Sequence, residues 1–171
     1  QYTLIDIARQ MTQVLAMVGK YEEALSTIEE TINLEATYSP EMNVLKGYLY
    51  LKTNQTDKAI SLFNEALLLS GNDMAIIYQI GVAEYESHMY TMAHDLFRKI
   101  TVETNDETAN CGWAYYAACC LELGDIQGFT NALKTACTTN PAEVAFVFEN
   151  VMTDNVIQSN YYEYIKKKFI Q

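Results

Sequence analysis

Residues 40–73 read PEMNVLKGYLYLKTNQTDKAISLFNEALLLSGND, and the 34 residues that follow repeat their landmarks. A glycine, an alanine and a phenylalanine each recur 34 positions later. The pairs are Gly47 and Gly81, Ala59 and Ala93, and Phe63 and Phe97. Self-similarity at a fixed period of this length indicates a repeat architecture.

The period extends in both directions from these two units. Upstream, a step of 35 relates Gly19, Ala24 and Ile28 to Asn54, Ala59 and Phe63. Downstream, a step of 36 relates Phe97 to Leu133. The sequence therefore predicts four units, at about 5–38, 40–73, 74–107 and 110–143.

Each unit has the sequence pattern of a helical hairpin. A helical run of about 14 residues ends in a short turn, and a second run of similar length follows. The turns fall at Gly19, Asn54, His88 and Gly124. Glycine and asparagine suit the left-handed residue that ends a helix, and Thr56 or Asp125 can cap the next one.

Two of the glycines lie inside predicted helices. Gly47 and Gly81 each cost about 1 kcal/mol relative to alanine at such positions. A cost repeated at the same place in two units indicates close approach of another helix. On the second helices, Ala59, Ala66 and Ala93 sit at matching close-contact places, with Phe63 and Phe97 one turn beyond filling the gap between layers. Helices that pack mainly on their sequence neighbours form a stacked solenoid.

This pattern resembles the tetratricopeptide repeat family, and in particular its small bacterial members. The fourth unit carries further signature positions, which are Trp113, Gly124, Ala136 and Pro141. Three residues depart from the family pattern: Thr12 at a small-residue position, His88 at a turn glycine and Phe129 at an alanine. The resemblance implies an all-α fold, a right-handed α/α superhelix (solenoid) of about four hairpins, in one domain spanning 1–171.

After Pro141 the period fades, although the chain still has the pattern of helices. The sequence predicts capping helices over about 142–170, as Ala142–Met152 and Val156–Ile170. A solenoid needs such an element to cover the apolar face of its last repeat. The residues expected to pack on the fourth unit are Val144, Val147, Phe148 and Val151, with Tyr161, Tyr164 and Ile165 behind them.

The composition narrows the class of partner. The 171 residues carry 11 basic and 22 acidic side chains, a net charge of −11, which disfavours nucleic acid. No apolar run approaches the ~20 residues of a membrane-spanning helix, so no membrane association is expected. The four cysteines form no CxxC pair and favour buried thiols of a reducing compartment, so we expect a cytoplasmic protein.

We expect neither an enzyme nor a cofactor. His88 falls at a turn and His94 on the following helix, and neither pairs with a nucleophile at a recognisable spacing. Nucleotide-binding glycine motifs and metal-ligand spacings are absent from the sequence. His88 and His94 are predicted to be surface residues.

The resemblance also implies a binding face, because in the family the first helix of each hairpin lines the concave side. Carried over, the peptide-binding residues are Arg9, Gln13, Val44, Tyr48, Leu51, Tyr78, Val82, Tyr85 and Ala118. Within a helix these residues share one face, and tyrosine offers contact area with a polar tip. The same stripe is equally compatible with packing inside the protein. The basic clamp with which some relatives hold a partner's carboxylate is absent.

The leading functional hypothesis is a protein-interaction scaffold that holds a peptide or partner helix in this groove. One alternative is a secretion-type chaperone. Another is an architectural or oligomerisation segment of a larger protein, without a ligand of its own, so a homo-oligomer is possible.

Overall fold

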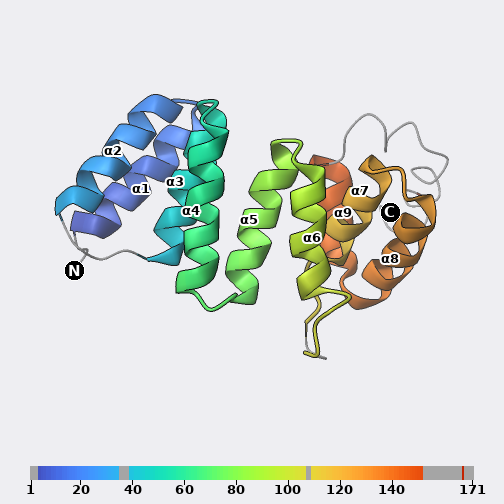
Figure 1. Ribbon diagram of the computed structural model, residues 1–171. Helices are drawn as coiled ribbons and strands as arrows, with labels where there is room; N and C mark the ends of the chain where they lie inside the picture. The colour runs from blue at the N-terminus through green and yellow to red at the C-terminus, as the bar shows by residue number, and fades with distance from the viewer. Residues whose placement is uncertain (1–3, 35–38, 107–108, 152–166, 168–171) are drawn as a thin grey trace. The chain divides into compact units, whose positions relative to one another are not determined.

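A computed structural model of the chain describes residues 4–34, 39–106, 109–151 and 167. Within these residues it contains nine α-helices and no strand, which confirms the all-α class (Figure 1). The helix predicted over Val156–Ile170 lies, apart from Lys167, outside the described residues. The handedness of the superhelix and the single-domain organisation stay predictions. The chain divides into two compact units, residues 1–76 and 77–171, and each is described by itself.

The first unit contains two helical hairpins. Its helices are α1 (Leu4–Met17), α2 (Tyr21–Leu34), α3 (Pro40–Lys52) and α4 (Thr56–Leu69). α1 packs on α2, α3 packs on α4, and α2 contacts α3 across the two hairpins. Gly19 and Asn54 have φ of 80° and 60° at the turns, in the left-handed conformation that the sequence predicted there.

The second unit continues the hairpin pattern and ends in a single described helix. Its helices are α5 (Met74–Glu86, belonging to this unit from Ile77 onward), α6 (Tyr90–Ile100), α7 (Trp113–Glu122), α8 (Ile126–Thr139) and α9 (Pro141–Asn150). α7 contacts α6 and α8, and α9 contacts both α7 and α8. His88 occupies the turn between α5 and α6 with φ of 62°. It therefore takes the left-handed conformation of the glycine that it replaces.

Two helices are shorter than the predicted length of about 14 residues, since α6 has 11 and α7 has 10. α6 ends at Ile100, because the next residue, Thr101, has φ of −120° and ψ of −80°, outside the helical region. α7 begins after Gly112, whose φ of 103° is outside the helical region. The sequence-based length was wrong for these two helices.

The mid-helix glycines lie against phenylalanine rings of the paired helix. A Cβ atom added to Gly81 would lie 2.8 Å from the Phe97 ring, and one added to Gly47 would overlap the Phe63 ring. Both rings are buried. The close approach inferred from the sequence is therefore present in both hairpins.

The first and fourth hairpins have different residues at the corresponding positions. The repeat steps relate Gly47 to Thr12 and Ala117, and they relate Phe63 to Ile28 and Leu133. All four of these substitutes are buried. Where the first helix gains side-chain volume the second helix loses it, which keeps the hairpin interior near constant volume.

Helix α9 covers the end of the second unit. Val144 and Val147 have no exposed surface and Phe148 is 4% exposed, and the helix packs on α7 and α8. The Asn140 side chain caps its first turn by accepting the Glu143 backbone N–H at 3.1 Å, and Pro141 occupies the first turn. This part of the predicted C-terminal cap is confirmed.

Candidate functional site

In the first unit, the predicted binding residues of α3 divide into a buried and a partly exposed set. Val44 is 7% exposed and packs inside the unit, whereas Tyr48 and Leu51 keep part of their side chains at the surface. The Lys52 ammonium lies 5.4 Å from the centre of the Tyr48 ring and 5.8 Å from that of Tyr21. A cation at these distances is attracted to the ring faces. The surface of α3 around Tyr48 is therefore aromatic and carries the positive charge of Lys52.

The α1 members of the predicted groove are polar and exposed. The Arg9 guanidinium lies 3.5 Å from the Asp6 carboxylate within the same helix, and Gln13 is one turn further along. An exposed pair of this kind contributes little to stability. The charge of Arg9 is therefore locally balanced.

A second contact of the first unit joins its two hairpins. The Tyr50 hydroxyl of α3 donates to Glu29 Oε1 of α2 at 2.7 Å, and the Lys46 ammonium lies 3.7 Å from the same oxygen. Tyr50 is buried, so its hydroxyl needs this partner. These residues position α3 against α2.

In the second unit, α5 supplies the next predicted binding residues. Tyr78 is half-buried and its ring meets Phe97 and Tyr115 edge-on, with centroids 5.9 and 5.7 Å away. Val82 keeps part of its surface exposed, but Tyr85 is 2% exposed. Burial raises the pKa of both tyrosines, and the nearby Glu143 carboxylate adds to the effect at Tyr78.

Three of the predicted binding residues are therefore packing residues in this structure. Val44, Tyr85 and Ala118 are 7%, 2% and 0% exposed, so their side chains meet neighbouring helices rather than solvent. Burial follows from their position on the side of the first helix that contacts adjacent helices, which periodicity alone does not separate from the solvent side. Partner binding by the remaining predicted residues stays a prediction.

The sequence reasoning did not identify Glu143, which connects three helices of the second unit. Its carboxylate accepts the backbone N–H groups of Gly112 at 2.9 Å and of Ala114 at 3.1 Å, at the start of α7. The Tyr78 hydroxyl donates to it at 3.3 Å. Burial raises the pKa of Glu143, and these hydrogen bonds act in the opposite direction. A glutamate three residues after an asparagine cap is the signal that could have marked it as a helix-terminus residue.

A buried carboxyl group also lies on α5. Glu84 is 2% exposed, and its Oε2 atom has no hydrogen-bond partner among the described residues. Burial raises its pKa to about 8, and the Asp95 carboxylate adds to this shift. The hydroxyl of neighbouring Tyr85 is likewise buried without a partner in the described part of the chain. The aromatic interior of this unit thus contains two uncompensated polar groups.

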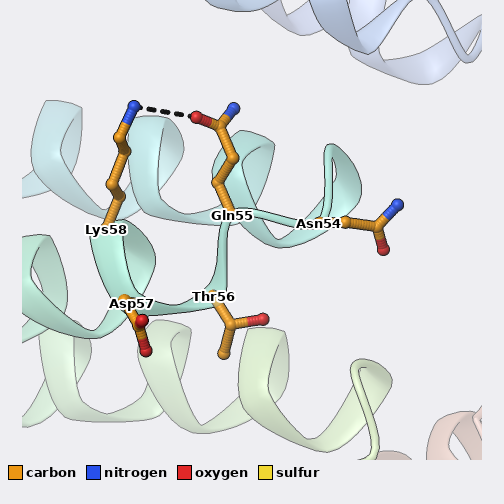
Figure 2. A pocket seen from close by; sticks show the side chains of 5 residues that line it. All are labelled: Asn54, Gln55, Thr56, Asp57 and Lys58. Carbon is orange, nitrogen blue, oxygen red and sulfur yellow. Dashed lines mark hydrogen bonds between the residues drawn. The ribbon is translucent and has the colours of Figure 1, made fainter.

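A depression of about 330 Å³ lies at the turn between α3 and α4, and Figure 2 shows its lining. Five consecutive polar residues form it: Asn54, Gln55, Thr56, Asp57 and Lys58. The Lys58 ammonium donates to Gln55 Oε1 at 2.9 Å, so these two side chains engage each other (Figure 2). The depression is open to solvent and brings no distant residues together.

The two histidines have different surroundings. His88 is exposed, as predicted, and its ring stacks on Tyr90 with centroids 5.6 Å apart. His94, on α6, is partly exposed, and its ring lies 5.1 Å from that of Tyr116. Across the described ranges, no group of three or more His, Cys, Asp or Glu side chains could hold a metal ion.

Cys119 and Cys120 are buried thiols on α7. Burial raises the pKa of both, to about 11 for Cys120, so neither is activated as a thiolate. None of the helices in the described part of the chain is both long enough and apolar enough to cross a membrane.

Comparison with known proteins identifies the class of the fold. A family model described as Tetratricopeptide repeat matches residues 40–73, the stretch predicted as the second repeat. No curated protein gives a significant match to the chain. The matched repeat, and the hairpins around it, support the identification of the chain as a tetratricopeptide repeat protein. Repeats of this family are non-catalytic and generally mediate protein–protein interactions.

Proposed function

We propose that the chain is a scaffold that binds a peptide or a partner helix on the first-helix faces of its hairpins. The observation that carries the proposal is the surface of α3, where Tyr48 and Leu51 stay partly exposed beside Lys52. Tyrosine, which offers a large apolar ring with a polar tip, is enriched at protein-binding surfaces.

The chemistry of this surface defines the partner that we expect. Leu51 and the ring of Tyr48 offer apolar area, and the Lys52 ammonium lies over two tyrosine rings at their edge. A peptide that places an apolar side chain on the tyrosine and a carboxylate near the lysine would satisfy both. Val82 and Tyr78 form the corresponding surface of α5 within the second unit.

The test uses a peptide selected from a random displayed library on the purified chain, with affinity measured by fluorescence anisotropy. Tyr48→Ala is expected to weaken binding about tenfold or more, as the loss of an aromatic anchor does. Leu51→Ala should weaken it less. Leu68→Ala is the matched control, because Leu68 is 82% exposed on α4, the second helix of the same hairpin.

The proposal fails if Tyr48→Ala and Leu51→Ala bind the peptide as the unchanged chain does while their circular dichroism and melting temperatures show intact folding. It also fails if Leu68→Ala weakens binding as much as Tyr48→Ala. Cytoplasmic location stays a prediction. The secretion-type chaperone and the architectural role also stay predictions, because no observation in the described residues favours either of them over peptide binding.

A further inference from the structure

Five exposed apolar side chains form a stripe along α1, and the last of them, Val18, lies one residue beyond the end of the helix. We define the α1 stripe as five residues that are each more than half exposed: Leu4, Ile7, Met11, Val14 and Val18. They are separated by steps of 3, 4, 3 and 4 residues, the spacing of a helix that packs along a second helix. Met17, at the edge of the stripe, is 86% exposed.

The same positions are buried in the next hairpin. The repeat step of 35 relates Ile7 to Met42 and Val14 to Leu49. Ile7 and Val14 are 52% and 59% exposed, whereas Met42 and Leu49 are 6% and 0% exposed on α3, which packs against α2. The α1 stripe therefore has the form of a repeat-packing face on which none of the described helices packs.

A different side of α1 carries its fully buried residue. Thr12 has no exposed surface, and its hydroxyl donates to the Ala8 carbonyl oxygen at 2.7 Å. Since α1 packs on α2, the side of the helix that carries Thr12 serves the first hairpin, and the α1 stripe is left exposed.

The charge on α1 favours a second copy of the chain as the partner. The chain as a whole carries a net charge of −11, so two copies repel each other over most of their surface. α1 contains one acidic and one basic residue, Asp6 and Arg9, which pair at 3.5 Å. The α1 stripe is therefore an electrically neutral and apolar place where two copies can approach.

The area is also sufficient for a pair. Burying each exposed side chain of this size removes about 100 Å² of apolar surface from water, or about 500–600 Å² per copy. Two copies would bury about 1,000–1,200 Å², at the lower limit of specific interfaces. Association of moderate strength follows, because area alone does not give high affinity.

We propose that the α1 stripe packs against the α1 stripe of a second copy, forming a two-helix seam with Met11 near its centre. This surface lies on the side of the helix away from Arg9 and Gln13. The inference concerns self-association, so it goes beyond the peptide-binding function and does not depend on it.

The test is sedimentation velocity of the whole chain from about 1 to about 200 µM, the range in which an interface of this size dissociates. The unchanged chain should shift from monomer toward dimer as its concentration rises. Val14→Asp should shift the midpoint at least about 100-fold to higher concentration, because it places a charge in the seam. Met11→Gln, which keeps a helix-forming side chain of similar length, should weaken the dimer less.

Val102→Asp is the matched control, since Val102 is 50% exposed in the second unit and outside the α1 stripe. It should dimerise as the unchanged chain does. The proposal is overturned if the unchanged chain stays monomeric throughout, which would leave the face to a different helix. It is also overturned if Val14→Asp and Met11→Gln dimerise as tightly as the unchanged chain while circular dichroism shows that both variants are folded.

Discussion

The first and last described helices, α1 and α9, have similar apolar patterns and opposite fates. On α9 the apolar side chains Val144 and Val147 are fully buried against α7 and α8 within the second unit. On α1 the side chains of Ile7 and Val14 are more than half exposed. An apolar face on a repeat helix is therefore core or surface according to whether its unit supplies a neighbour, and the pattern alone does not decide which.

The same comparison applies to matched positions inside the two units. The repeat step of 34 relates Tyr50 to Glu84 and Asn43 to Ile77. Tyr50 has a hydrogen-bond partner, whereas the Oε2 atom of Glu84 has none among the described residues. The side chain of Asn43 is buried without a partner there, but Ile77 is an apolar residue in an apolar place. Among the described residues, each unit thus buries an unpartnered polar side chain at a position where the matched residue of the other unit is either hydrogen-bonded or apolar.

The largest expected effect on stability comes from replacing a valine with aspartate, in one variant on α9 and in another on α1. Val147→Asp should lower the free energy of unfolding by about 4 kcal/mol, because it buries an unpaired carboxylate. Val14→Asp should change the stability of the monomer by less than about 0.5 kcal/mol, because the position is exposed. Urea denaturation at low protein concentration measures both. Equal losses of stability would contradict the contrast between α1 and α9.

The next effect tests the packing that both units share. Gly81→Leu should destabilise by about 3 kcal/mol, because the side chain has no space beside the Phe97 ring. Gly81→Ala should cost less, and Gly81→Ala combined with Phe97→Leu should recover part of that cost, since it reproduces the Ala117 and Leu133 pair of the fourth hairpin. A double-mutant cycle measures the coupling. Simple additivity of the two substitutions would show that the glycine and the ring do not constrain each other.

The third effect concerns the buried carboxyl of the second unit. The folded protein holds the pKa of Glu84 at about 8, above its ordinary value of 4.5, so the folded state keeps a proton that the unfolded chain loses. The stability contributed by the neutral form is complete below about pH 4.5 and is lost as the pH rises through about 8. At pH 9, Glu84→Gln should therefore be more stable than the unchanged chain by several kcal/mol, and this advantage should vanish by about pH 4.5.

Urea denaturation of the two proteins from pH 4.5 to 9 gives this difference, in which the contributions of the other groups cancel. Asp95→Asn is a useful second variant, because removing the neighbouring charge should narrow the gap between the two proteins at high pH. A difference that stays constant over the whole range would contradict a carboxyl held neutral at Glu84.

The smallest effect on stability concerns Asn43, the buried amide of the first unit. Asn43→Ile, which copies Ile77, should raise the free energy of unfolding by about 1 kcal/mol, because it removes a buried amide that has no hydrogen-bond partner among the described residues. The reverse change, Ile77→Asn, should destabilise by more than this amount. Thermal denaturation of both variants measures the pair. A loss of stability in Asn43→Ile would show that the amide has a structural role.

Much of the fold could be predicted from the sequence, because the residues that recur in each repeat depend on the local geometry of the helices and turns. Gly47 and Gly81 showed where helices approach closely, and Gly19 and Asn54 showed where they turn. The spacing of Val144, Val147 and Phe148 predicted the part of the cap that the structure describes. All of these are short-range consequences of backbone freedom and side-chain volume.

The candidate site was less predictable, because exposure depends on neighbours far along the chain. Tyr48 and Tyr85 are both tyrosines on the first helix of a hairpin. Tyr48 is partly exposed, whereas Tyr85 is enclosed by Tyr90 and Tyr115. The hydrogen bond from Tyr78 to Glu143 joins residues 65 positions apart, and no local pattern reports a contact of that span. The exposed state of the α1 stripe escaped prediction for the same reason.

The most direct test of the central claim, that the first-helix faces bind a peptide, is a map of backbone amide chemical shifts on adding the selected peptide. The account predicts the largest changes in α3 from Tyr48 to Lys52, with smaller ones around Arg9 and Gln13 of α1. Changes concentrated in α4 around Leu68, with α3 unaffected, would contradict it.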